Sequence, residues 1–338
     1  MQQAIETKEQ AWEVIHQIEE QVRYIVIGQD ELVRKILIGL FGRIPYSFRR
    51  GEGEKAGSGH ILLEGVPGLA KTLLVSAISN TIRAKFQRIQ FTPDMLPADI
   101  LGTRIFDSRS GEFRVEKGPI FANIVLADEI NRAPQKTQSA LLEAMQERQV
   151  TIGETTFHLE DPFWVLATQN PVEQEGVFSL PEAQLDRFAM MIRVHYPTPE
   201  SEFRMLLARL EETSVGAVAD PHAVVLIREM VSRVHVDDKV RRYIVALGQA
   251  TRNSRPDSLP IVREMVLHGA SPRSYQHLLA MSRTVAFFRG RDYVLPSDVK
   301  FIATDVLHHR LVRTIRAEVE NVSTDEVVLE VLRHTPIP

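Results

Sequence analysis

Residues 65–72 combine the residue types that bind phosphate. They read Gly65-Val66-Pro67-Gly68-Leu69-Ala70-Lys71-Thr72 and come directly after the apolar run 61–63. A strand that enters a small-residue loop ending in Lys-Thr directs backbone N–H groups and a helix N-terminus at an anion. The lysine then reaches the β- and γ-phosphates, and the threonine hydroxyl coordinates Mg²⁺. Ala70 departs from the usual pattern, because it stands where the second glycine is expected. The stretch predicts a phosphate site.

Two adjacent carboxylates, Asp128 and Glu129, come after the apolar run 124–127. Ligands of open α/β sheets bind at the carboxyl ends of the strands, which is where this pair would lie. Asp128 would hold Mg²⁺ through water, and Glu129 would orient and polarise an attacking water. The alternative is an acidic loop after a buried strand. The phosphate loop earlier in the chain favours the catalytic interpretation.

Three further polar residues are candidates for contact with a γ-phosphate. Asn170 closes the apolar strand 164–168, where an amide can touch both the phosphate and the lytic water; the alternative is an ordinary Asn-Pro turn. Arg187 precedes the last strand, and Arg273 comes after Ser271-Pro272, a pair typical of a helix start. Local sequence alone favours a surface ion pair for each arginine. An arginine that reaches a γ-phosphate is nevertheless worth roughly 10³–10⁵ in rate.

Composition bounds the class of protein. The chain has 338 residues, of which 44% are hydrophobic and 25% charged, as in ordinary globular proteins, and its length favours two domains. A net charge of −4 argues against a nucleic-acid coat or a membrane-surface protein. The absence of cysteine excludes disulfides and zinc–thiolate sites. Neither a signal peptide nor an apolar run of about 18 residues is found, so we expect a cytoplasmic protein without membrane insertion.

Strands and helices alternate through the first part of the chain, as in a parallel sheet flanked by helices. The predicted strands are 61–64, 86–91, 124–127, 164–168 and 190–195. Helical periodicity predicts helices over 7–24, around 32–41, over 71–82 and over 135–147. Residues 49–59 are predicted to form a mobile loop, residues 92–119 an irregular insertion, and residues 149–159 a β-hairpin.

The prolines of 196–199 predict a domain boundary, with a nucleotide-binding core over 1–197 and a smaller helical domain over 198–338. Within the second domain Arg310, Arg313 and Arg316 recur at helical spacing, which favours a solvated helix face over a partner-binding face. The histidine pair His308-His309 has no partners at metal-ligand spacing, so surface or core histidines are favoured over ligands.

The motifs together resemble the AAA+ ATPases, and specifically the MoxR family. The phosphate loop, Ala127-Asp128-Glu129-Ile130-Asn131-Arg132-Ala133-Pro134, Ala167-Thr168-Gln169-Asn170-Pro171 and the segment 181–188 occur in the expected order and spacing. The insertion 92–119 resembles the family's helix-2 insert, the hairpin 149–159 resembles its pre-sensor-1 hairpin, and the segment 322–327 is also similar. The family commonly has alanine at the position of Ala70. The implied fold is a P-loop AAA+ α/β core followed by a smaller all-α lid.

The resemblance implies a role for each candidate. Lys71 and Thr72 become Walker A, Asp128 and Glu129 Walker B, Asn170 sensor 1, Arg187 an arginine finger acting on a neighbour's nucleotide, and Arg273 sensor 2. Arg132 either contacts the adjacent subunit or caps the next helix. The implied ATP-binding set is Val26, Ile27 and Gly28 around the adenine, then Gly65, Val66, Pro67, Gly68, Leu69, Ala70, Lys71, Thr72, Leu73, Asp128 and Arg273, with Mg²⁺ at Thr72 and Asp128.

The leading hypothesis is an ATP-hydrolysing, chaperone-like remodeller that forms a homo-oligomer, expected to be a hexameric ring. By resemblance, its client would be a protein or complex in assembly or cofactor insertion, with von Willebrand factor A domains as a candidate partner. A nucleic-acid motor is the alternative, but the hairpin 149–158 holds no Lys or Arg for phosphate contacts. A nucleotide-gated switch with little hydrolysis is another, and Glu129 and Arg187 argue against it.

Overall fold

The computed structural model describes residues 5–47, 55–66, 68, 71–109, 111–171, 177–207, 215–253 and 258–338. It divides into two compact units, each built from separate stretches of chain. Unit 1 comprises Met1–Leu40, His60–Leu180 and Ile192–Ile227, and unit 2 comprises Phe41–Gly59, Pro181–Met191 and Arg228–Pro338.

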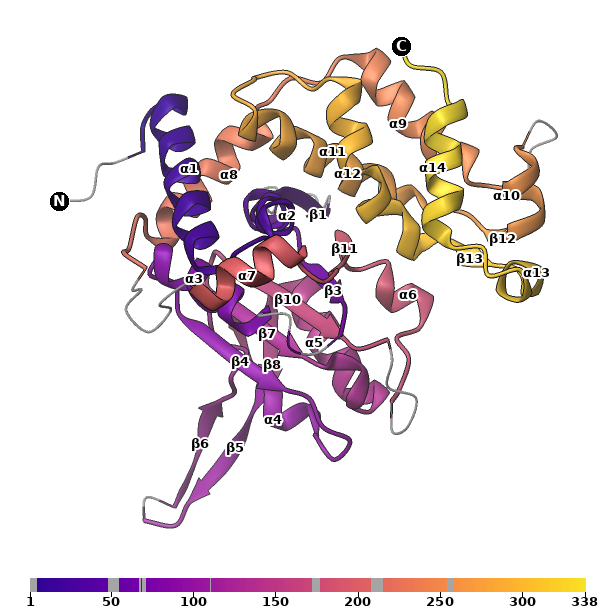
Figure 1. The fold of residues 1–338 in the computed structure, drawn as a ribbon. Coiled ribbons are helices and arrows are strands. Elements are labelled where there is room, and N and C mark those ends of the chain that lie inside the picture. The colour runs from indigo at the N-terminus through magenta and orange to yellow at the C-terminus, as the bar shows by residue number, and fades with distance from the viewer. Residues whose placement is uncertain are drawn as a thin grey trace. The chain divides into compact units, whose positions relative to one another are not determined.

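A five-stranded sheet has the order β11-β3-β10-β7-β4 (Figure 1), with four strands in unit 1 and β11 divided between the two units at Met191 and Ile192. Its strands are β3 (Ile61–Glu64), β4 (Phe86–Gln90), β7 (Ile124–Asp128), β10 (Trp164–Gln169) and β11 (Met190–Arg193). The β10–β3, β10–β7 and β4–β7 pairs are parallel. The central strands β7 and β10 are buried almost throughout because helices cover the sheet, which explains their continuous apolar runs. The predicted strands are confirmed.

The helices of unit 1 are α1 (Lys8–Ile25), α2 (Asp30–Phe41), α3 (Lys71–Thr81), α4 (Pro97–Leu101), η1 (Ile130–Arg132), α5 (Gln135–Glu147) and α7 (Pro199–Leu207), and α8 (Pro221–Ser232) contributes to both units. Helices α1, α2, α3 and α5 begin and end close to where periodicity predicts them, whereas α4 and η1 were not predicted. Helix α1 starts at a capping box in which the Thr7 hydroxyl accepts from Gln10 N while the Gln10 side chain accepts from the Thr7 backbone. Its apolar face, with Ile15, Ile18 and Val22 buried, supports α3.

The insertion 92–119 is ordered rather than irregular, and that prediction is wrong. It contains α4 and a hairpin of β5 (Gly102–Asp107) and β6 (Glu112–Lys117). Most of the hairpin's side chains are exposed, so its strands lack the apolar run or the alternation that marks a strand in sequence. Two strands that pair through their backbones but bury neither face need no apolar run and no alternation of apolar and polar residues.

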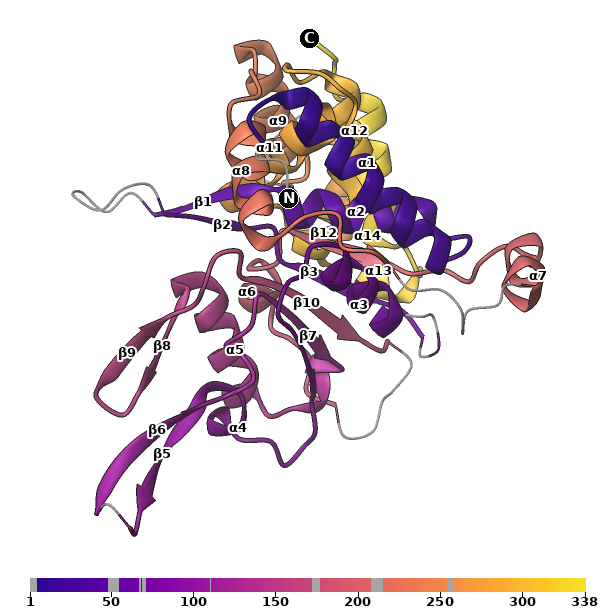
Figure 2. The same cartoon turned by 90° about the vertical axis from the view of Figure 1, so that its left-hand side faces the viewer.

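The predicted hairpin at 149–159 is confirmed as β8 (Gln149–Ile152) paired with β9 (Thr155–His158). In Figure 2 both hairpins extend from the same side of the sheet. They also touch: the ammonium group of Lys117 lies 4.9 Å from the ring centre of Phe121 and 5.0 Å from that of Phe157. A Cβ on Gly153 would lie only 2.5 Å from Cδ of Arg104. The two hairpins therefore pack as one projection.

Unit 2 is mainly helical, with two short two-stranded ladders added. Its elements are β1 (Arg43–Ser47), β2 (Lys55–Ser58), α6 (Glu182–Leu185), α9 (Asp238–Ala250), α10 (Pro260–Met265), β12 (Val266–His268), α11 (Pro272–Phe288), α12 (Pro296–Leu307), η3 (His308–Arg310), β13 (Val312–Arg313), α13 (Ile315–Val319) and α14 (Thr324–His334). The predicted loop 49–59 is wrong over residues 55–58, which form β2; residues 49–54 lie outside the described residues.

The predicted basic helix face does not exist. Arg310 ends η3 and is buried, Arg313 lies in β13, and Arg316 lies in α13. The chain changes direction between these elements, so regular spacing in the sequence does not become one face. The histidines His308 and His309 are buried in the core of unit 2.

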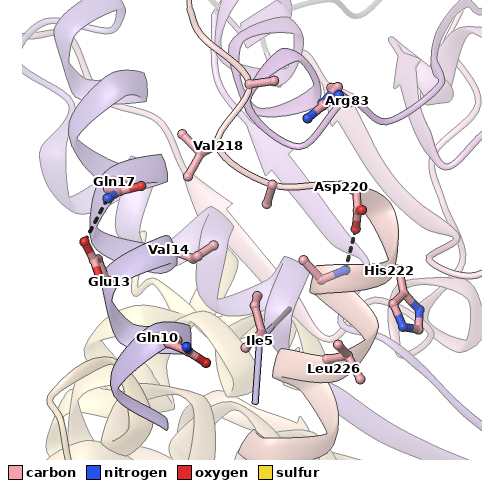
Figure 3. Close-up of a pocket in the computed structure, with 13 residues that line it drawn as sticks. Ile5, Gln10, Glu13, Val14, Gln17, Arg83, Val218, Asp220, His222 and Leu226 are labelled. Carbon is pink, nitrogen blue, oxygen red and sulfur yellow. Dashed lines mark hydrogen bonds between the residues drawn. The ribbon is translucent and has the colours of Figure 1, made fainter. Parts of the chain in front are cut away.

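Two observations bound other sites. In the part of the chain that the structure describes, no helix is long and apolar enough to cross a membrane. A hollow of about 870 Å³ in unit 1 lies among α1, the chain after α3 and the start of α8 (Figure 3). Gln17 donates to Glu13 at 3.2 Å on one of its walls, and Asp220 accepts from Ala223 N at 2.9 Å on another. Among its described lining residues are none of the predicted ATP-binding set.

Candidate nucleotide-binding and hydrolysis site

The strand order of unit 1 brings three loops together. Because β10 lies between β3 and β7, the phosphate loop, Asn170 and the carboxylate pair all leave neighbouring parallel strands at their carboxyl ends. The register pairs Gln169 with Glu64 and Ala167 with Ala127. The carboxylate pair and Asn170 are distant in the sequence, yet the sheet ends their two strands side by side.

The phosphate loop leaves β3 through Gly65. The Gly65 N–H donates to the Gln169 carbonyl at 3.3 Å, and a Cβ at Gly65 would lie 3.0 Å from Cβ of Val194. Gly68 has φ +87° and is exposed, a backbone conformation that suits glycine. Pro67, Leu69 and Ala70 lie outside the described residues.

Lys71 begins α3, as its predicted role requires. Its ammonium group donates to the Gly65 carbonyl at 2.6 Å and so lies across the loop. Burial lowers the pKa of Lys71 from its ordinary value, while the charges of Asp128 and Glu129 raise it. Lys71 is thus within electrostatic reach of both carboxylates. Thr72 is half-buried in the same first turn, and Leu73 is 40% exposed.

Asp128 is held by two neighbours on adjacent strands. Its Oδ1 accepts from the Thr168 hydroxyl at 2.7 Å, and its Oδ2 accepts from the Arg88 guanidinium at 2.5 and 3.1 Å. The Thr168 hydroxyl also accepts from Glu129 N at 2.9 Å. Thr168 is 2% exposed and therefore fixes the backbone and side chain of the carboxylate pair together. Sequence reasoning missed this role because Thr168 reads as one more residue of a buried strand.

Glu129 has φ +56°, the left-handed conformation that residues other than glycine rarely adopt. With this conformation the chain leaves the extended path of β7 at Glu129 and begins η1. The Glu129 Oε2 accepts from Gln90 Nε2 at 2.7 Å and from Arg132 Nη1 at 3.0 Å. Arg132 therefore pairs within its own subunit in this structure. Arg88 in turn donates to Gln90 at 2.7 Å, so the two β4 side chains act together on the carboxylates.

Asn170 comes immediately after β10 and is buried, with 7% exposed. In the predicted adenine segment, Val26 is buried while Ile27 and Gly28 are half-buried. Gly28 has φ +78°, and a Cβ there would lie 2.3 Å from Cβ of Ser201. Only glycine fits this approach of the α1–α2 connection to α7.

Arg187 and Arg273 both belong to unit 2. Helix α11 begins at Pro272 after Ser271, as the sequence predicts, so Arg273 lies in its first turn. The Ser271 hydroxyl does not cap the helix; it donates to the Asp186 carboxylate at 3.1 and 3.3 Å. Arg273 Nη1 lies 3.5 Å from Asp186 Oδ2. The Arg187 side chain is half-buried and forms no hydrogen bond or ion pair with any described residue.

The residues of unit 1 suit Mg²⁺ and a nucleotide phosphate. Mg²⁺ takes hydroxyl, carboxylate and water oxygens, and Thr72 and Asp128 provide the first two. The Lys71 ammonium donates to a backbone carbonyl, and Asp128 Oδ2 pairs with Arg88, an arginine half exposed to solvent. Lys71 could exchange its carbonyl partner for a phosphate oxygen, and Asp128 could exchange Arg88 for a cation. These residues therefore fit Mg²⁺ and a nucleotide phosphate.

Comparisons with known proteins agree with this geometry. The family model for "ATPase family associated with various cellular activities (AAA)" matches residues 60–190, and the AAA lid domain matches residues 259–331. The chain is 44% identical over 320 residues to Chaperone MoxR1 of Mycobacterium tuberculosis, covering 94% of this chain and 81% of that protein. It is 28% identical over 311 residues to Protein MoxR of Methylorubrum extorquens, covering 87% and 86%.

A solved structure is similar over the whole chain. This is the crystal structure of a protein from Cytophaga hutchinsonii assigned as an ATPase, with 43% identity and a TM-score of 0.87, covering 98% of this chain and 97% of the other. The parallel core, the helical unit and the sequence matches all lead to one assignment. The chain belongs to the MoxR family of AAA+ ATPases.

Proposed function

We propose that the chain hydrolyses ATP to ADP and phosphate and uses the reaction to remodel a client protein. The observation that carries the proposal is the Asp128–Glu129 pair, fixed by Thr168 at the sheet edge beside Lys71. Water attacks the γ-phosphorus as the bond between that phosphorus and the β–γ bridging oxygen breaks and ADP leaves, while Glu129 orients the water and accepts its proton. Lys71 offsets the negative charge of the phosphates. Thr72 and Asp128 would hold Mg²⁺, which would neutralise charge on the phosphate oxygens when bound.

The remaining roles are proposed from the resemblance. Asn170 and Arg273 would sense the γ-phosphate, and Arg187 would act on the nucleotide of a neighbouring subunit in a hexameric ring. Val26, Ile27 and Gly28 would contact the adenine. Residues 1–197 would then form the catalytic domain and residues 198–338 the lid. Loss of the γ-phosphate would remove the contact that Asn170, Arg273 and Arg187 share. The lid and the neighbouring subunit could then move relative to the catalytic domain.

Glu129→Gln tests the reaction. The amide cannot accept the proton, so kcat should fall on the order of 10²–10⁴-fold, while ATP binding persists. Glu143→Gln, an exposed glutamate of α5, is the matched control and should keep wild-type turnover. Unchanged turnover in Glu129→Gln would remove Glu129 from the mechanism. Tight ATP binding by the wild type with negligible turnover would instead favour the nucleotide-gated switch.

The client is proposed to be a protein. One relative is named as a chaperone, which supports this class, and a partner with a von Willebrand factor A domain in complex assembly or cofactor insertion is the candidate. The joined hairpins offer exposed aromatic rings for such a client: Phe106 is 55% and Phe113 60% exposed, with ring centres 5.2 Å apart. Aromatic residues are enriched in protein–protein interfaces relative to the rest of the surface.

One observation favours the nucleic-acid motor as a second candidate. Although β8 and β9 carry no Lys or Arg, the neighbouring hairpin exposes cations at Arg104, Arg109, Arg114 and Lys117. Acidic residues Asp107, Glu112 and Glu116 alternate with them, which weakens any field that attracts phosphate. Stimulation of ATP hydrolysis by single-stranded DNA, with a steep loss as salt rises, would support the motor. No stimulation at low salt would leave the protein client.

A further inference from the structure

Arg310 is a buried cation whose side chain forms hydrogen bonds with residues 186, 188 and 189, just before β11. We call these contacts the clamp. The Arg310 side chain is 1% exposed. Nε donates to Asp186 Oδ1 at 2.8 Å, and Nη2 donates to the Phe188 carbonyl at 2.5 Å and to the Asp186 carbonyl at 3.4 Å. Nη1 donates to the Ala189 carbonyl at 3.5 Å and to the Val306 carbonyl.

The guanidinium has a further partner in His277. Its Nη2 lies 2.5 Å from His277 Nδ1, and because arginine has no acceptor, His277 must accept. Burial lowers the pKa of Arg310 to about 10, while Asp186 raises it, so the group stays charged at neutral pH. A buried charge with this many partners fixes its surroundings, since moving any of them would leave a donor unpaired.

The residues that Arg310 contacts lie on both sides of Arg187 in the sequence. Arg310 holds residues 186, 188 and 189, while the Arg187 side chain itself engages no other described residue. The clamp therefore fixes the backbone of Arg187 and leaves its guanidinium available. A guanidinium that must reach a phosphate bound to another subunit needs this combination of a fixed backbone and an unengaged side chain.

Asp186 joins the clamp to Arg273. Its Oδ1 meets Arg310, its Oδ2 lies 3.5 Å from Arg273 Nη1, and the Ser271 hydroxyl donates to both oxygens. Asp186 is thus shared by the segment that bears Arg187 and by the first turn of α11. A solvated surface pair would have fewer partners and would hold neither segment in place.

We propose that Arg310 and Asp186 are positioning residues for Arg187 and set its approach to the nucleotide of a neighbouring subunit. The proposal rests on the proposed function, because it requires that Arg187 act in trans. An error of about 1 Å in the placement of a reacting group costs on the order of 10²-fold in rate. Loss of the Arg310 contacts should therefore lower kcat with little effect on ATP binding, since the phosphate loop is untouched and Arg273 and Ser271 keep their own contacts to Asp186.

The test uses the full chain and mixed subunits. Arg310→Lys keeps the charge but loses the planar fork of donors. Alone it should lower kcat by about 10- to 100-fold and change the Kd for ATP by less than about threefold. Mixing it with an excess of Glu129→Gln subunits, which bind ATP and carry an intact clamp and Arg187, should restore turnover at the Arg310→Lys sites. A loss of kcat that the mixture does not restore would overturn the proposal.

Arg187→Ala separates this inference from the proposed function. If Arg187→Ala hydrolyses ATP at the wild-type rate, or is not restored in the same mixture, the trans role of Arg187 fails. If Arg187→Ala is impaired and restored while Arg310→Lys turns over normally, only the clamp fails. Asp298→Asn is the matched control: Asp298 is a buried carboxylate of unit 2, paired with Arg289 and Arg291. It should lower thermal stability and leave kcat unchanged below the melting temperature.

Ser271→Ala covers the case in which Arg310→Lys does not fold. It deletes only the hydroxyl that donates to Asp186 and keeps the buried ion pair. We expect a loss in kcat of about two- to fivefold, in line with one hydrogen bond, with the same restoration in mixtures. A wild-type kcat in Ser271→Ala, or a loss that mixing does not restore, would contradict the proposal.

Discussion

The hydroxyl of Thr168 donates a 2.7 Å hydrogen bond to the carboxylate of Asp128 across the β10–β7 pair. The same oxygen accepts from Glu129 N at 2.9 Å, so one buried side chain holds both the Asp128 carboxylate and the backbone of Glu129. Thr168→Val keeps the volume and removes these bonds. We expect kcat to fall about 10- to 100-fold and the free energy of unfolding to fall by about 1–3 kcal/mol, because the Glu129 N–H is left unpaired.

Steady-state ATP hydrolysis and thermal melting measure the two effects. Thr168→Ser retains the hydroxyl and is the matched variant, which should stay close to wild type in both measurements. Wild-type turnover in Thr168→Val would show that the carboxylates hold their positions without the threonine.

Arg88 occupies the Asp128 oxygen that a cation would need. Its guanidinium lies 2.5 Å from Asp128 Oδ2, and its side chain is 47% exposed. Arg88→Ala should therefore lower the Mg²⁺ concentration for half-maximal ATP hydrolysis by about two- to fivefold, as expected for a half-exposed ion pair. A titration of turnover against Mg²⁺ measures this. Arg114→Ala, an exposed arginine of β6, should leave the titration unchanged, whereas a higher Mg²⁺ requirement in Arg88→Ala would mean that Arg88 helps to bind phosphate.

His309 makes the stability of unit 2 depend on pH. Burial lowers the pKa of His309 well below its ordinary value, and the charge of Arg310 and the neighbouring His308 and His277 lower it further, while the hydrogen bond to the Phe188 carbonyl raises it. The folded state thus keeps His309 neutral, while the unfolded chain protonates near pH 6.5. The unfolded state binds more protons in this window, so stability falls as pH drops below about 6.5, by up to about 1.4 kcal/mol per pH unit.

Melting temperatures measured between about pH 5 and pH 7 test this linkage. His309→Gln keeps an N–H donor for the Phe188 carbonyl and cannot be protonated. Its melting temperature should depend less steeply on pH than that of the wild type. Equal slopes in the two proteins would rule out His309 as the responsible group.

The exposed rings at the hairpin tip should matter for a client and not for folding. The double change Phe106→Ser and Phe113→Ser removes two rings that are more than half exposed. We expect a change in unfolding free energy of less than about 0.5 kcal/mol per site and basal ATP hydrolysis within about twofold of wild type. Binding of a permanently unfolded polypeptide, measured by fluorescence anisotropy, should weaken. Ile315→Ser with Val319→Ser removes an exposed apolar pair of α13 and should leave that binding unchanged.

The sheet strands, the phosphate loop and the start of α11 could be predicted from the sequence, because each depends on residues close together in the chain. The sheet strands are readable because strands buried on both faces must be continuously apolar, and the phosphate loop is readable because a cradle for an anion needs small residues before Lys-Thr. The start of α11 at Pro272 is readable for the same reason: the Ser-Pro pair favours a first helical turn at that point.

Features that depend on distant partners are not readable. Arg310 looks like part of a solvated stripe, but its partner Asp186 lies 124 positions earlier in the chain and makes burial possible. Thr168 and Arg88 act on Asp128 from other strands, at separations of 40 positions. The β5–β6 hairpin pairs through its backbone while most of its side chains face water, so no buried face marks it.

Contact between the two hairpins has a mechanical consequence. Helix α5 begins at Gln135, shortly after Glu129 and η1, and ends at Glu147, from which Arg148 leads directly into β8. At 13 residues it is about 20 Å long, so a tilt of about 10° at its catalytic end would displace its far end by roughly 3–4 Å. Lys117, Phe121 and Phe157 join the hairpins, and the longer β5–β6 arm must move with the shorter one. A small change at Glu129 that tilted α5 would thereby displace Phe106 and Phe113 as well, without a separate hinge in the β5–β6 hairpin.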